Sequence, residues 1–93
     1  MSKSKSPRLK IVEREDNYEP ILALELETKS YCYTLESQIM YDSDSYEGDI
    51  SNINSFIKIS KDIAKEMKIP VTVSKEVRSA ISDLKTFIKE NKQ

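Results

Sequence analysis

The chain has 93 residues, of which 33% are charged and 38% hydrophobic, and it contains no His, one Cys and one Gly. This length fits one domain, and the missing histidines exclude a Ser-His-Asp triad, a Cys-His pair and a zinc site that uses imidazole. One cysteine excludes an internal disulfide, one glycine excludes glycine-rich phosphate loops, and no apolar run approaches the roughly 18 residues of a membrane span.

The first part of the chain combines a basic tail with a strand and a turn. Residues 1–7 alternate Ser with Lys and end at Pro7, which predicts a disordered tail before a single domain over residues 8–93. A short strand is expected from Leu9 to Glu15. Residues 17–20 follow as a turn, because Asn and Pro favour a bend.

Two alternating segments then predict a β-hairpin. Leucines occupy every second position of residues 21–27. Over residues 31–36, Tyr31, Tyr33 and Leu35 alternate with Cys32, Thr34 and Glu36. The polar link at residues 28–30 contains neither Gly nor Asn, which tight turns usually need, so a helix across residues 31–41 is the alternative for the second arm. Cys32 is expected to fill a small space in the core.

The second half of the chain predicts two amphipathic helices. Asp49 or Ser51 caps a helix over about residues 51–68, and Ser74 caps another over about 75–90. Pro70 ends the first helix, and residues 71–73 are expected to be an extended linker. The apolar positions are Ile53, Phe56, Ile57, Ile63, Ala64 and Met67, then Val77, Ala80, Ile81, Leu84, Phe87 and Ile88.

The predicted fold class is therefore α+β. We expect a small antiparallel sheet of two to three strands, at about residues 9–37, with both helices packed on it.

Charge is segregated along the chain although the net charge is only −1. Residues 1–10 carry a net charge of +4, residues 11–56 carry −9, and residues 57–93 carry +4. An acidic middle between two basic ends predicts a dipolar surface, unless folding mixes the three segments.

The loop at residues 41–49 is the main candidate site, because it combines four carboxylates with two tyrosines. Tyrosine offers a large apolar surface with a polar tip and recurs at binding surfaces. The alternative is a solvated loop whose acids help to start the next helix. The loop lacks the first aspartate and the last glutamate of a calcium-binding loop, so no metal is expected. The candidate partner-binding residues are Tyr41, Asp42, Asp44, Tyr46, Glu47 and Asp49.

Residues 61–81 resemble the helix-turn-helix of bacterial repressors, although Lys68 replaces the usual turn glycine and Ser74 replaces an apolar residue. Apolar or small residues match the family's pattern at Ile63, Ala64, Met67, Ile69 and Val77. The resemblance implies DNA binding through Lys61, Lys65, Lys75 and Arg78. The overall pI near 5.5 argues against this function.

We expect no catalysis and no cofactor. The preferred interpretation is a cytoplasmic binding module whose acidic surface docks onto a basic protein, such as a nucleic-acid-handling complex, and blocks its nucleic-acid site. In character this is similar to the compact acidic inhibitors of viruses and mobile elements. The alternatives are a DNA-binding regulator and a structural subunit of a larger assembly. No membrane contact is expected, nucleic acid is a partner only for the regulator, and a homodimer is compatible with either alternative.

Overall fold

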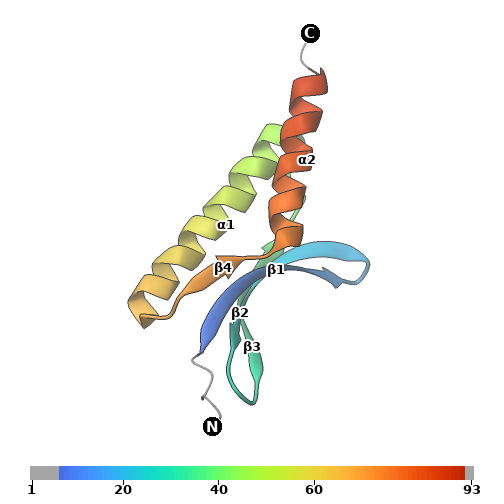
Figure 1. Cartoon of the computed structure of the whole chain (residues 1–93). Helices are drawn as coiled ribbons and strands as arrows, with labels where there is room; N and C mark the ends of the chain where they lie inside the picture. Colours follow the sequence, from blue (N-terminus) through green and yellow to red (C-terminus); the bar gives the residue numbers. More distant parts are fainter. Residues whose placement is uncertain (1–6, 92–93) are drawn as a thin grey trace.

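The computed structural model describes residues 7–91, so the predicted tail lies outside the described residues except for Pro7. Both helices cover the same face of a four-stranded sheet (Figure 1). This arrangement confirms the α+β class. The elements are β1 (Arg8–Asp16), β2 (Glu19–Glu27), β3 (Cys32–Ile39), α1 (Tyr46–Met67), β4 (Val71–Val73) and α2 (Lys75–Asn91).

The first hairpin pairs β1 with β2 through a two-residue turn, Asn17–Tyr18. Both turn residues have positive φ, 53° and 66°, as in the type I′ turn that matches the right-handed twist of a hairpin. Asn tolerates this backbone conformation, whereas Tyr is strained by its Cβ. The turn predicted at residues 17–20 is confirmed at residues 17–18, whereas residues 19 and 20 already belong to β2, and β1 is slightly longer than the expected strand.

The second hairpin joins β2 to β3, so the alternative helix across residues 31–41 is wrong. The Thr28 hydroxyl accepts hydrogen bonds from the backbone N–H groups of Ser30 at 3.3 Å and Tyr31 at 3.0 Å. The Thr28 N–H also donates to the Tyr31 carbonyl at 2.8 Å. None of these residues has a positive φ. The Thr28 side chain therefore closes the turn without the Gly or Asn that tight turns usually need.

The sheet has one strand more than predicted, and it is not purely antiparallel. Its order is β3-β2-β1-β4, and β4 runs parallel to β1. Two backbone hydrogen bonds flank this pairing, from the Leu9 N–H to the Pro70 carbonyl and from the Ser74 N–H to the Ile11 carbonyl, both 2.9 Å. The extended linker predicted at residues 71–73 is this strand. Three residues are too few to show an alternating pattern in the sequence.

The first helix begins earlier than predicted. Ser45, rather than Asp49 or Ser51, is the N-cap of α1, and its hydroxyl accepts from the Gly48 N–H at 3.0 Å. The predicted cap of α2 is confirmed, because the Ser74 hydroxyl accepts from the Val77 N–H at 3.3 Å. Part of the predicted acidic loop is therefore the first turn of a helix.

The core lies between the helix-facing side of the sheet and the two helices. Met67 and Phe87 were expected in it but are exposed. Phe87 lies in the C-terminal part of α2, which extends away from the sheet (Figure 1), whereas Met67 is the last residue of α1. Cys32 is also exposed, since β3 is an outer strand, so its predicted core position is wrong. The buried apolar core residues are Leu9, Ile11, Leu22, Leu24, Met40, Ile53, Phe56, Ala64, Val77, Ala80 and Leu84.

Within residues 7–91, neither helix combines the length and the apolar composition that a bilayer crossing requires.

Candidate functional site: an acidic cleft between β1 and α2

The structure distributes the six predicted loop residues over different surroundings. Asp49 is buried in the first turn of α1, and its Oδ1 accepts a hydrogen bond from the Ser43 N–H at 3.0 Å. The positive end of the helix dipole favours a carboxylate at this position. Asp49 therefore orders the loop before α1 and is not available to a partner.

The aromatic ring of Tyr46 lies at the far end of the helix pair. Its centroid is 5.5 Å from that of Phe87 on α2. Asp44 and Glu47 line the shallow depression beside Tyr46, whereas Asp42 lines another depression with residues of β3 and α1. Asp42, Asp44 and Glu47 are exposed, but they do not form one continuous site with Tyr41.

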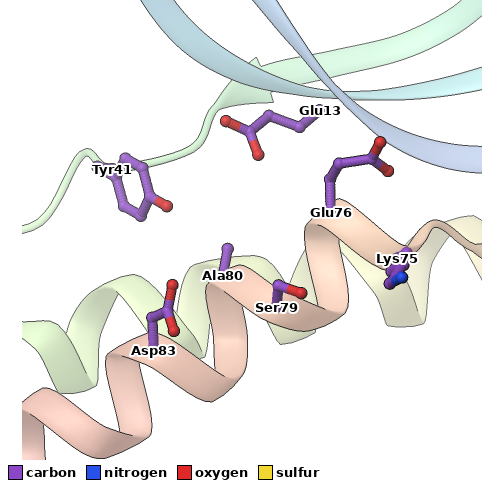
Figure 2. Close-up of a pocket in the computed structure, with 7 residues that line it drawn as sticks. All are labelled: Glu13, Tyr41, Lys75, Glu76, Ser79, Ala80 and Asp83. Atoms are coloured by element: carbon purple, nitrogen blue, oxygen red, sulfur yellow. The ribbon is translucent and has the colours of Figure 1, made fainter.

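Tyr41 lies elsewhere, in an open cleft of about 450 Å³ between α2 and the end of β1. Figure 2 shows its hydroxyl directed into this cleft. Burial raises the pKa of the Tyr41 hydroxyl, and the negative charges of Glu13, Asp49 and Asp83 raise it further. The hydroxyl therefore lies in a partly buried position near three negative charges.

Three carboxylates from two elements line the same cleft as Tyr41. Glu13 comes from β1, where it follows Leu9 and Ile11 on the helix-facing side of the sheet. Glu76 and Asp83 come from α2, seven residues apart and therefore on the same side of that helix. Their carboxylates lie around the same opening in Figure 2. We call Glu13, Tyr41, Glu76 and Asp83 the acidic cleft.

The acidic cleft is poorly neutralised by the protein itself. Its one cationic lining residue is Lys75, at the start of α2. Among residues 7–91, the ion pairs are Lys10–Glu27 and Arg14–Glu25, and both involve carboxylates outside the cleft. The carboxylates of the cleft are therefore free to receive cations from another molecule.

A second depression continues the acidic cleft toward the first hairpin. It has a volume of about 530 Å³ and shares Glu13 and Glu76 with the cleft. Glu15 adds another carboxylate there, next to Arg14. Four carboxylates and two cations, Lys75 and Arg14, line the two depressions together, so their combined lining has a net negative charge.

Sequence reasoning missed three residues of this site. Glu13 ends an alternating apolar face, and that polar interruption was the available signal. Glu76 and Asp83 belong to the segment with a net charge of +4, so the charge of the whole segment concealed them. Their spacing of seven residues could have revealed a shared side of the helix.

The four cations of the DNA-binding alternative are all exposed. Lys61 and Lys65 lie on α1, and Lys75 and Arg78 lie on α2. The helices are joined by residues 68–74, which include β4 and its pairing with β1. This connection differs from the three- to four-residue turn of a helix-turn-helix.

The chemistry of the cleft suits cation binding by oxygen atoms. In the described part of the chain, no three Cys, Asp or Glu side chains gather closely enough to hold a metal ion. Carboxylates and a phenol hydroxyl can instead accept hydrogen bonds from ammonium or guanidinium groups.

Comparison with known proteins found no match to a family model, a curated protein or a solved structure.

Proposed function

We propose that the protein is a small non-enzymatic binding module that docks onto a basic protein partner through the acidic cleft. The observation that supports this proposal most directly is the convergence of Glu13, Glu76 and Asp83, without an ion pair among the described residues. Lys75 is the one cation that lines the cleft beside these three carboxylates, so the cleft keeps an excess of negative charge that a cationic partner can offset.

The geometry of the cleft suits a lysine or arginine side chain. Carboxylates at its rim attract the cationic head, while the ring of Tyr41 and the methyl group of Ala80 contact the aliphatic stem. The charges speed the encounter of the two proteins, and the buried apolar contact slows their dissociation. The same arrangement continues along the depression that contains Glu15, so the cleft can accept more than one cationic side chain.

A protein that handles nucleic acid is the partner class that fits this chemistry. Such proteins present grooves of Lys and Arg to phosphate groups, and carboxylates compete for the same cations. In this proposal, the docked module occludes the partner's nucleic-acid site. A partner captured by the wild-type protein, but not by a cleft variant, is expected to lose nucleic-acid binding when the module is added.

The direct test uses an Arg- and Lys-rich peptide titrated into the full chain and followed by NMR. We expect the largest shifts at residues lining the cleft. The triple variant Glu13→Gln, Glu76→Gln, Asp83→Asn should bind at least about tenfold more weakly, which corresponds to a loss of roughly 1.4 kcal/mol. Higher salt should weaken the wild-type interaction.

A matched variant separates the cleft from the overall charge of the protein. Glu36→Gln, Asp62→Asn, Glu66→Gln removes the same number of exposed carboxylates outside the cleft and should weaken binding much less. A third variant, with Asp42, Asp44 and Glu47 changed to amides, tests the loop predicted from the sequence. Equal losses in the first two variants would show that only the net charge matters and would reject the acidic cleft.

A further inference from the structure

The outer strand β3 has an unpaired backbone edge. Among the described residues it pairs with β2 alone, at one side of the sheet. Seven of its eight residues are exposed, and Gln38 is half-buried. An outer strand of this length, roughly 27 Å, presents a row of free N–H and C=O groups to any extended chain.

The other edge of the sheet is built differently. β4 has only three residues, and it lies against α1 (Figure 1). Proteins commonly protect an outer strand with short length, lysines, prolines or bulges. β3 contains neither Lys nor Pro, and Glu36 is its one charged residue. The one protective feature on this edge is a β-bulge at Leu35. It lies between Thr34, which pairs with Glu25, and Glu36, which pairs with Leu24.

Apolar side chains are concentrated along β3. Four of the ten exposed large hydrophobic residues within residues 7–91 fall between residues 31 and 39. The rings of Tyr31 and Tyr33 also contact each other, with centroids 5.8 Å apart. The exposed fractions are 66% for Tyr31, 49% for Tyr33, 37% for Leu35 and 38% for Ile39. Only one of the eight residues of β3 is charged, in a protein in which one residue in three is charged.

We infer that β3 pairs antiparallel with β3 of a second copy of this chain, which joins two four-stranded sheets into one of eight strands. The low charge of β3 favours a second copy of β3 as its pairing partner. A strongly basic or acidic partner gains little from a strand with one carboxylate, whereas a second β3 is equally apolar and nearly neutral. Antiparallel pairing about a twofold axis lets both copies use the same backbone groups, with roughly six to eight new hydrogen bonds.

The dimer and the acidic cleft use different surfaces. The cleft is lined by residues of β1 and α2 and by Tyr41, which lies beyond the end of β3, whereas the backbone groups that pair in the dimer belong to residues 32–39. A dimer therefore keeps both clefts open and offers two docking sites to a partner. The inference does not depend on the proposed function, because it requires no basic protein.

Sedimentation velocity of the full chain over a concentration series tests the inference. At about 100 µM we expect the wild type to sediment as a dimer, and Leu35→Lys and Thr34→Lys to sediment as monomers with unchanged circular dichroism. Thr34→Lys keeps the test decisive if Leu35→Lys fails to fold. Ile59→Lys and Tyr18→Lys place the same charge on exposed residues of α1 and of the first turn, and they should leave the dimer intact.

Amide hydrogen exchange gives a second measurement. In the dimer, the outward-facing N–H groups of β3 should exchange at least about tenfold more slowly at high protein concentration than at low concentration. A wild-type protein that is monomeric at every concentration would overturn the inference. A dimer that persists in both β3 variants, or that is lost in Ile59→Lys, would overturn it as well.

Discussion

Arg14 reaches across the first hairpin to Glu25, on the sheet face opposite the helices. Its Nη2 lies 2.7 Å from Glu25 Oε1 and its Nε lies 2.9 Å from Glu25 Oε2. The pairing register places Val12 and Ala23 between these residues, so the Arg14 side chain passes over both. Val12 and Ala23 are only 9% and 1% exposed, although no helix covers them. The ion pair therefore shields Val12 and Ala23 from solvent on the face of the sheet that no helix covers.

Replacing only one partner of the Arg14–Glu25 ion pair should lower the stability of the fold. Arg14→Met keeps most of the aliphatic stem but leaves the buried Glu25 carboxylate without its partner, and it should lower the free energy of unfolding by about 1–3 kcal/mol. Lys10→Met breaks the pair with Glu27, which is 3.5 Å long and partly exposed on both sides, and should cost less than about 1 kcal/mol. Urea unfolding measures both changes. Equal losses in the two variants would contradict the special role of Arg14.

The same ion pair should make stability depend on acidity. Hydrogen bonding by Arg14 holds the pKa of Glu25 below its ordinary value. A carboxyl with a lower pKa in the folded state stabilises the protein fully above its ordinary pKa, about 4.3, and loses that contribution as the pH falls through the lower folded pKa. The free energy of unfolding should therefore fall more steeply in the wild type than in Glu25→Gln below about pH 4.5. Parallel curves for the two proteins between pH 3 and 7 would be evidence against this coupling.

The fold could be predicted wherever a pattern extended over several residues. Alternation revealed β2 and β3, and helical spacing revealed most of α1 and all of α2. The strand at residues 71–73 escaped because its pairing partner is more than sixty residues earlier in the chain, and three residues carry no period of their own. The start of α1 was missed because its first turn contains Gly48 and several acids, which are typical of loops.

The site depended on tertiary contacts that no linear pattern contains. The charge blocks predicted one acidic surface from residues 11–56, but folding pairs Glu25 and Glu27 with cations and buries Asp49. It also brings Glu76 and Asp83 from a basic segment to Glu13. The total charge of a segment describes its composition, whereas a binding surface depends on which side chains converge after folding.

A glycine in place of Tyr18 should stabilise the turn between β1 and β2. Tyr18 has a φ of 66° and is 95% exposed, so it bears the cost of a left-handed backbone with little contact to offset it. Tyr18→Gly removes this strain and should raise the free energy of unfolding by about 1 kcal/mol. Tyr18→Ala keeps a Cβ and should gain little. If alanine stabilises as much as glycine, the benefit comes from removing the ring and not from the backbone.

The buried hydroxyl of Ser60 should lower the stability of the core. Ser60 is completely buried on α1, and its Oγ has no hydrogen-bond partner among the described residues. An unsatisfied buried hydroxyl costs roughly 1–3 kcal/mol, because it gives up water and receives nothing in exchange. Ser60→Ala removes the hydroxyl and leaves the backbone unchanged, so it should raise the free energy of unfolding by about 1 kcal/mol or more.

A second serine on α1 provides the control for this change. Ser55 is exposed on the same helix, and Ser55→Ala should gain only the helical preference of alanine, about 0.5 kcal/mol. The difference between the two variants in urea unfolding therefore isolates the buried hydroxyl. Gains of the same size at both positions would mean that the Ser60 hydroxyl is already satisfied in the folded protein, for example by a buried water molecule.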